Sequence, residues 1–233
     1  GGAGSGSAGL TGFVSVWATT GAFETITIPT QNATFNAVVD WGDGTIETIT
    51  SSTGFTHVYA DIDDYTISIT GVFPNIYLNG GPESTKIKKV LNLGTVGWTV
   101  LVNSFGGCPN LTEFTAGSTD TSSVVNMTQL FRSCTGLTSV DVSSFDTSSV
   151  IDMSLMFFNC GSLTSMIGVE DWDITGLNGK MTTAQYDNLL VNWRAQDPFN
   201  GMTPSFGAST YTGGGAAATA RAELIAIDGW SIS

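Results

Sequence analysis

The residues best suited to acid–base chemistry lie together in the first third of the chain. His57 is the only histidine, and Asp40 and Asp43 come shortly before it. A histidine held by a carboxylate can act as a general base, but such a site needs a third partner, and the sequence shows none. Asp43 also stands in the hairpin-turn signal Asp43-Gly44. We therefore expect a packing or hydrogen-bonding role for His57, no catalytic residues and a protein that is not an enzyme.

Three more carboxylates, Asp61, Asp63 and Asp64, follow in the same region. Carboxylate oxygens are the ligands that Ca²⁺ prefers in proteins. Their spacing is not that of a known calcium loop, so a solvated acidic loop is the favoured interpretation and a Ca²⁺ site the alternative. No other metal and no cofactor is predicted.

The three cysteines, Cys108, Cys134 and Cys160, are 26 residues apart. Phenylalanine and leucine recur around them at the same offsets, at Phe105, Phe131 and Phe157 and at Leu111, Leu137 and Leu163. A unit of this length cannot close a core of its own, so its copies must stack and bury equivalent residues against one another. The sequence therefore predicts ladders of core side chains, in which the cysteines are free, buried thiols.

Two other roles for the cysteines are less favourable. A disulfide between adjacent repeats would join parallel Cβ vectors about 4.8 Å apart, which exceeds the ~3.8 Å typical of a disulfide. Zinc sites use short paired spacings, and no histidine lies near these cysteines. A structural ladder is the favoured interpretation.

Each repeat carries the patterns of two short elements. Leu137–Val142 is a β-prone run, whereas apolar residues of 153–160 fall at helical spacing, with Asp152 as a candidate N-cap. One strand and one short helix per copy predict an α/β solenoid.

The repeated phrases support a family resemblance. The stretch LTSVDVSSFDTSSVIDMSLMFFNCGSLTS resembles the leucine-rich repeat of BspA-like surface proteins, which occur in bacterial envelopes and in some phage structural proteins. The resemblance covers about residues 87–180, with irregular first and last copies, as expected where a solenoid is capped. It implies a non-enzymatic surface protein.

The segment before the repeats has a different pattern. Apolar residues alternate over 35–41 and 65–69, as in antiparallel strands. The phrases Asp40-Trp41-Gly42-Asp43-Gly44 and His57-Val58-Tyr59 resemble those of a PKD domain, an immunoglobulin-like sandwich of extracellular proteins. This resemblance covers about residues 11–72, and we expect a tight junction with the repeats.

These patterns together predict a mixed fold in four parts. Residues 1–10 are a Gly/Ser-rich linker or arm, 11–73 a PKD-like sandwich, 74–180 a leucine-rich-repeat solenoid, and 181–233 a helical C-terminal cap. In the cap, one helix is predicted to open at Met181-Thr182-Thr183 and to carry Tyr186, Leu189, Leu190 and Trp193 on one face. A second is predicted at about 216–227, followed by a strand at Trp230.

Composition restricts the partners. The net charge is −13, and Lys86, Lys88 and Lys89 form the only basic cluster, so nucleic-acid binding is not expected. No stretch approaches the ~20 apolar residues of a transmembrane helix, and membrane insertion is not expected either. With 12% charged residues and 29 glycines, the chain suits an extracellular β-rich protein.

The leading functional hypothesis is therefore an extracellular binding or structural module. The missing signal peptide favours a phage virion protein, such as a tail fibre or capsid decoration, that contacts a host surface or neighbouring subunits; the alternative is a bacterial adhesin that binds glycan or host protein. The repeated turns at 120–123 and 146–149 are expected to be structural. Contact with a partner is predicted at aromatic loops around Trp98, Trp172 and Phe199 and at the acidic end of the sandwich.

Overall fold

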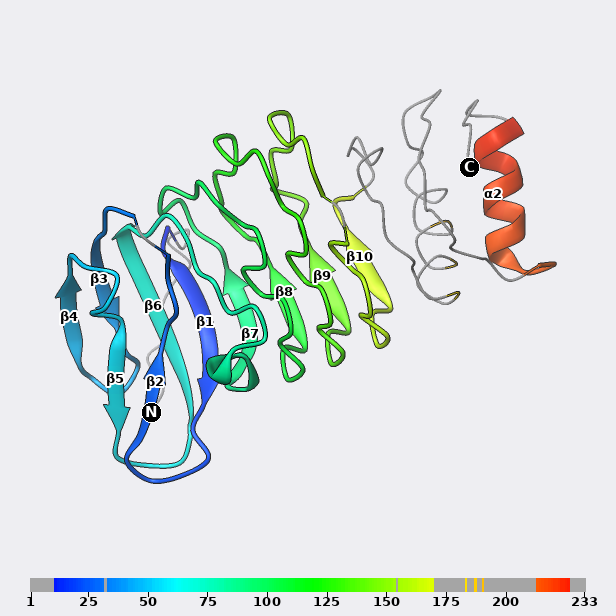
Figure 1. The fold of residues 1–233 in the computed structure, drawn as a ribbon. Helices are drawn as coiled ribbons and strands as arrows, with labels where there is room; N and C mark the ends of the chain where they lie inside the picture. Colours follow the sequence, from blue (N-terminus) through cyan, green and yellow to red (C-terminus); the bar gives the residue numbers. More distant parts are fainter. Residues whose placement is uncertain are drawn as a thin grey trace, which may run out of the picture.

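The computed structural model describes residues 11–31, 33–153, 155–169, 183, 187, 190 and 213–226 (Figure 1). Residues 1–10, Trp172 and Phe199 lie outside these ranges. Of the first predicted helix of the cap, only Thr183, Asp187 and Leu190 are described, and all three are helical. The predicted strand at Trp230 also lies outside the described residues.

Six strands form before residue 73, where apolar residues alternate with polar ones. They are β1 (Phe13–Ala18), β2 (Glu24–Thr27), β3 (Asn36–Asp40), β4 (Ile46–Ile49), β5 (Thr56–Tyr59) and β6 (Asp64–Val72). Alternation of buried and exposed side chains along β3 places Ala37 and Val39 in the core. This β-rich part is consistent with an immunoglobulin-like arrangement.

Short strands recur through the rest of the chain. A 3₁₀ turn, η1 (Pro82–Thr85), leads into β7 (Ile87–Asn92), and three strands follow: β8 (Glu113–Thr115), β9 (Ser139–Asp141) and β10 (Ser165–Ile167). Strands β7 to β10 lie parallel and side by side (Figure 1). Ser139 pairs with both Glu113 and Ser165, so the 26-residue spacing of the sequence is the register between β8, β9 and β10.

The strands of both halves form one sheet. Eight strands run in the order β10-β9-β8-β7-β1-β6-β3-β4, and only β2 and β5 form a separate pair. Antiparallel pairing of β1 with β7 joins the two halves, with Trp17 opposite Ile87. The predicted fold, a sandwich followed by an α/β leucine-rich-repeat solenoid with a helical cap, is therefore wrong: the structure is mainly one large mixed sheet.

The predicted helix of each repeat is absent from the described residues. Residues 155–159 form turns, and Leu155 and Asn159 have φ of 57° and 59°, the left-handed region that interrupts a right-handed helix. Backbone amides of these turns donate across repeats: Phe131 N–H donates to the carbonyl of Met156 at 3.0 Å. The amides therefore have partners in the next repeat and do not need a helical ladder. Asp152 caps no helix and instead bridges to Asn126.

One continuous core runs beneath the sheet. It includes Trp17 and Trp41 of the first half and reaches Met166 in β10. Inside the repeats, the Phe131 ring stacks between those of Phe105 and Phe157, with centroid separations of 6.1 and 5.5 Å. The halves are thus joined by burial of apolar side chains as well as by the β1–β7 ladder.

The C-terminal part contains one helix with described bounds, α2 (Ala216–Ala226), where the sequence predicts a helix over 216–227. Its Ala217 and Ala220 side chains are buried. The predicted helical cap over 181–233 is corrected to this one short helix, the only helix with bounds among the described residues of that range. Within the described residues, no helix is long and apolar enough to cross a membrane.

Candidate functional site

The carboxylates of Asp40, Asp43, Asp61 and Asp63 lie near two tyrosines, and Asp64 follows Asp63 in the chain; we call these five residues the acidic end. Asp40 and Asp43 belong to the β3–β4 hairpin, whereas the other three stand where β5 turns into β6. Burial raises the pKa of Tyr59, and the charges of Asp43 and Asp40 raise it further. Burial also raises the pKa of Tyr65, followed by the charges of Asp61, Asp63 and Asp43. One surface therefore concentrates negative potential.

His57 is fixed between two aromatic rings and one carboxylate of the acidic end. Its Nε2 lies 2.7 Å from Asp43 Oδ2, and its ring stacks on Trp41 at 5.1 Å. The edge of Tyr59 faces the same imidazole at 4.6 Å, and Tyr59 donates from its hydroxyl to the Trp41 carbonyl at 2.8 Å. The histidine thus holds the hairpin turn against β5, as a packing and hydrogen-bonding residue does.

The Asp43 carboxylate has a lowered pKa despite partial burial. Desolvation raises its pKa, but hydrogen bonds from His57 and from the Thr45 N–H outweigh that effect. Asp43 is therefore ionised at neutral pH and pairs with His57 whenever the imidazole is protonated. The hydrogen bonds of Asp43 to His57 and to the Thr45 N–H bring no further group on which a base could act.

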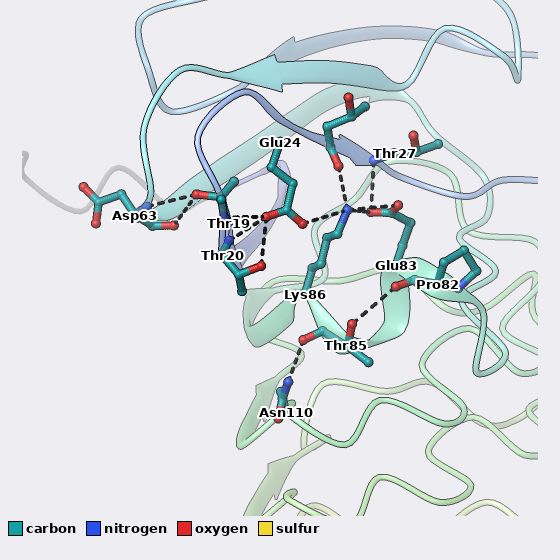
Figure 2. Close-up of polar contacts among 12 residues, drawn as sticks. Thr19, Thr20, Glu24, Thr27, Asp63, Pro82, Glu83, Thr85, Lys86 and Asn110 are labelled. Carbon is teal, nitrogen blue, oxygen red and sulfur yellow. Dashed lines mark hydrogen bonds and ion pairs between the residues drawn. The ribbon is translucent and has the colours of Figure 1, made fainter.

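The three carboxylates suggested as a Ca²⁺ site do not converge. Thr19 Oγ1 donates to the carbonyl of Asp61 and accepts from the N–H of Asp63, both at 2.9 Å. Figure 2 shows the contact with Asp63. The Asp63 side chain accepts from the N–H of Asp64. Within the described ranges, no group of three or more His, Cys, Asp and Glu side chains could hold a metal ion.

A second polar cluster surrounds Lys86, at the junction of η1 and β7 (Figure 2). Its ammonium donates to the carbonyl of Thr25 at 2.6 Å and pairs with Glu83 at 3.1 Å and Glu24 at 3.3 Å. Glu83 also accepts from the N–H of Thr27 at 3.2 Å. Lys86 and Glu83 thus bind outward-facing backbone groups of β2. We call Lys86, together with its carboxylate partners Glu83 and Glu24, the β2 clamp.

Strand β4 forms one end of the large sheet, opposite β10, and it carries no such clamp. It pairs with β3 alone, and Glu47 is its only charged residue. A cleft of about 320 Å³ runs along it, lined by Glu47, Thr48, Ile49, Thr50, Ser51 and Gly54. Glu47 accepts from the indole N–H of Trp41 at 2.8 Å, which fixes its carboxylate beside the hairpin.

Of the three aromatic residues predicted to contact a partner, the structure describes only Trp98. Trp98 is only 1% exposed, and its indole N–H donates to the carbonyls of Leu93 and Gly94. The prediction of an exposed loop around Trp98 is therefore wrong, because this indole ties the chain after β7 to the core. Trp172 and Phe199 lie outside the described residues.

The repeat residues singled out in the sequence lie in the core. The side chains of Phe105, Phe131, Phe157, Leu111, Leu137, Leu163 and the three cysteines are all buried. The cysteines are free, and Cys134 and Cys160 each donate from Sγ to a carbonyl of the preceding repeat, Phe105 and Phe131, at 2.9 Å. Burial raises the pKa of Cys108 and of Cys160, which keeps these two thiols protonated.

The repeated Asp-Thr-Ser-Ser phrases form turns. Asp120 accepts from the backbone N–H and hydroxyl of Ser122, and Asp146 does the same with Ser148. These bonds lower the pKa of both carboxyls. Thr121 donates to the carbonyl of Asp146, which joins successive turns. These contacts agree with the structural role expected for the phrase.

The sequence interpretation missed the β2 clamp and the open strand β4. A signal for both is the distribution of charge: the first basic residue of the chain is Lys86. The preceding residues carry eight carboxylates: Glu24, Asp40, Asp43, Glu47, Asp61, Asp63, Asp64 and Glu83. The first lysine after such a run marks the point where an ion pair with the first half can form.

Comparison with known proteins concerns the repeats. Residues 85–195 match a family model described as "Mycoplasma protein of unknown function, DUF285". The match begins in η1 and includes all of β7 to β10. This family is loosely related to BspA-like surface proteins. Comparison with curated proteins gives no match, and neither does comparison with solved structures.

Proposed function

We propose that the chain is a non-enzymatic binding module of a surface-exposed protein, and that it contacts its partner through the acidic end. The observation that carries the proposal is the charge distribution: Lys and Arg do not occur before Lys86, whereas eight carboxylates do. Such a one-signed surface attracts cationic partners and speeds their association. Only Glu24, Glu83 and Asp43 of the eight have a basic partner among the described ion pairs.

The family match supports a surface location. Residues 85–195 resemble a bacterial family that is loosely related to BspA-like surface proteins. A cell surface is therefore the placement we favour, with an adhesive role toward a host protein or glycan. Placement on a phage virion stays a prediction from the sequence. The PKD-like and leucine-rich-repeat resemblances also stay sequence predictions, and they agree with an extracellular setting.

The packing of His57 supports a binding rather than a catalytic role. The only histidine is held by Asp43, Trp41 and Tyr59 and serves the hairpin that presents Asp40. These three contacts of His57 fix the hairpin against β5 and so support a rigid acidic surface. A rigid surface lowers the entropic cost of binding.

The location can be tested with antibodies raised against the whole chain. Applied to intact cells of the source and to virions purified from its cultures, they distinguish the two placements. Labelling of intact cells is expected. Labelling of cells only after permeabilisation, with unlabelled virions, would overturn a surface role.

The binding face can be tested with fluorescent protein and intact cultured epithelial cells. One variant changes Asp40, Asp61, Asp63 and Asp64 to Asn. The matched control changes four acidic residues of the repeats, Glu113, Asp120, Asp141 and Asp146, to Gln or Asn, which removes the same charge elsewhere. We expect saturable binding that falls at least about tenfold in the first variant only. No saturable binding, or equal losses in both variants, would contradict the proposal.

A further inference from the structure

Two strand edges of the first half, those of β2 and β4, are treated differently. In β2, the β2 clamp occupies two outward backbone groups: Lys86 binds Thr25 C=O and Glu83 binds Thr27 N–H. Charged side chains that cover an edge prevent it from pairing with another strand. Strand β4, the end of the eight-stranded sheet, has only β3 as its neighbour.

The register shows which groups of β4 are open. Trp41 N–H donates to the carbonyl of Thr45 at 3.0 Å, and the same ladder pairs Val39 with Glu47 and Val38 with Thr48. Because hydrogen-bonded and non-hydrogen-bonded pairs alternate in an antiparallel ladder, Glu47 bonds to β3 whereas Ile46 and Thr48 direct their N–H and C=O outward. Across the described chain, no backbone bond outside the ladder involves Ile46 or Thr48.

Space for another strand lies beside these groups. The cleft of about 320 Å³ is lined by Glu47, Thr48 and Ile49 of β4 and by Thr50, Ser51 and Gly54 of the chain that follows. On the outer face of the sheet, Ile46 is 64% exposed, and Val38 on the neighbouring strand is 42% exposed. An added strand would therefore gain backbone hydrogen bonds at the edge and apolar contact with Ile46.

Charge indicates what kind of strand would fit. Glu47 lies in the middle of β4, and Asp40 stands opposite Ile46, with no ion pair to either carboxylate within the described part of the chain. A second copy of the chain would bring its own Glu47 against this one, and like charges opposite each other destabilise a sheet. Residues 1–10 contain no Lys or Arg that could satisfy Glu47.

The geometry points to β4 as a docking strand for an extended basic segment of a partner protein, which would add to the sheet beside it. The segment would alternate β-branched residues, facing Ile46 and Thr48 on the outer face, with Lys or Arg facing Glu47. This inference rests on the proposed binding function and specifies the partner as a protein segment.

Three peptides test the inference by isothermal titration with the full chain. The probe is the blocked heptapeptide Val-Lys-Val-Lys-Val-Lys-Val. The second peptide has the same sequence with alternate backbone amides N-methylated, and the third has Glu in place of Lys. We expect binding of the first alone, because the second cannot donate along the whole edge and the third is repelled.

Paired variants test the strand itself. Thr48→Pro removes an outward N–H that β3 does not need, and Thr48→Val is its control because it keeps that N–H. Glu47→Gln removes the charge while keeping an oxygen for the Trp41 indole, with Glu113→Gln as its control. Thr48→Pro should weaken binding at least about tenfold, and Glu47→Gln should weaken it less and reduce its salt dependence. Unchanged circular dichroism and thermal unfolding would show that Thr48→Pro is folded.

The outcomes separate this inference from the proposed function. Equal binding of the N-methylated peptide, or an unaffected Thr48→Pro variant, would overturn strand addition, whereas the cell-binding result for the acidic end would stand. If Thr48→Pro does not fold, strand addition is still tested by comparing how the blocked heptapeptide and its N-methylated form bind to the unaltered chain. Dimerisation of the unaltered chain in sedimentation experiments, abolished by Thr48→Pro, would mean that a second copy occupies β4 and would contradict the basic partner.

Discussion

The thiol of Cys134 donates a hydrogen bond to the carbonyl of Phe105, one repeat earlier, at 2.9 Å. Cys160 repeats the contact with Phe131 at the same distance. Each of these two cysteines therefore fills space in the core and also donates a hydrogen bond to the backbone of the preceding repeat. The position favours cysteine because the side chain is small, largely apolar and able to donate.

This contact predicts a difference between two otherwise equivalent cysteines. Cys134→Ala removes a bond of 2.9 Å to the carbonyl of the preceding repeat, whereas the carbonyl contact that Cys108→Ala removes is a longer one of 3.9 Å to Gly106 within its own repeat. Both lose similar buried volume. In urea unfolding, Cys134→Ala should lower the free energy of unfolding by about 0.5–1 kcal/mol more than Cys108→Ala. Equal losses would show that the bond contributes nothing beyond packing.

The thiols are expected to be unreactive in the folded protein. All three are free and buried, and burial raises the pKa of Cys108 and Cys160, so little thiolate is present at neutral pH. Titration with a thiol reagent should be slow in the native state and should find all three thiols after unfolding. Rapid native labelling, or fewer thiols after unfolding without reductant, would contradict this arrangement.

The β2 clamp predicts that Lys86 matters more than other lysines. Its side chain is 16% exposed, and Lys86→Met would leave Glu24 and Glu83 without their cation and Thr25 without a donor. We expect a loss of about 2 kcal/mol in the free energy of unfolding. Lys89→Met is the matched control, because the Lys89–Glu113 pair is 45% and 42% exposed and should contribute less than about 1 kcal/mol. Similar losses in both variants would argue against the clamp.

Part of the fold could be predicted from the sequence. The spacing of Cys108, Cys134 and Cys160 gives the distance in sequence between stacked positions, and the structure shows that distance as strand register. Alternation around Trp41 likewise gives β3 its buried face. Both signals are local repetitions of side-chain type. They report which residues point inward.

The helix prediction failed because periodicity does not report backbone dihedral angles. Inward-facing residues of 153–160 have helical spacing, but a series of turns with left-handed residues at Leu155 and Asn159 produces the same spacing. Leucine rarely adopts this conformation, so Leu155 gives no warning, whereas Asn159 belongs to a residue type that is enriched there. The single sheet was missed for another reason: β1–β7 pairing joins residues about 70 apart, and no local pattern encodes such a pairing.

The candidate site was predicted only in outline. The acidic end could be recognised from composition, but the burial of Trp98 could not, since its indole donates to carbonyls of a loop that looks exposed in sequence. Lys86 contacts Thr25 across 61 residues of sequence. Lys86 is the first lysine or arginine of the chain. That position indicates an ion pair with the first half only when the two halves are known to share a sheet.

Stability should fall in acid through the β2 clamp. Hydrogen bonds from the Thr20 N–H, the Lys86 ammonium and the Gly21 N–H lower the pKa of Glu24 below its ordinary 4.5, against the opposing effect of burial. A carboxyl with a lower pKa in the folded state contributes stability that is fully present above the unfolded pKa and is lost as the pH falls through the folded pKa. Urea unfolding should thus show a loss below about pH 4. Glu24→Gln should show a smaller loss over that range, and a loss equal to that of the unaltered protein would contradict the assignment.

The stacked phenylalanines predict where the repeats are most sensitive. Phe131 is fully buried between Phe105 and Phe157 and also meets the edge of Phe114 at 4.7 Å, so Phe131→Ala opens a cavity that several repeats share. We expect a loss of about 3–5 kcal/mol in the free energy of unfolding, measured in urea. Ser148→Ala is the control from the same repeat array, because it removes only an exposed bond to Asp146 and should cost less than about 1 kcal/mol. If both variants were equally destabilised, the burial of Phe131 would not be what holds successive repeats together, and the exposed turns would have to carry that role instead.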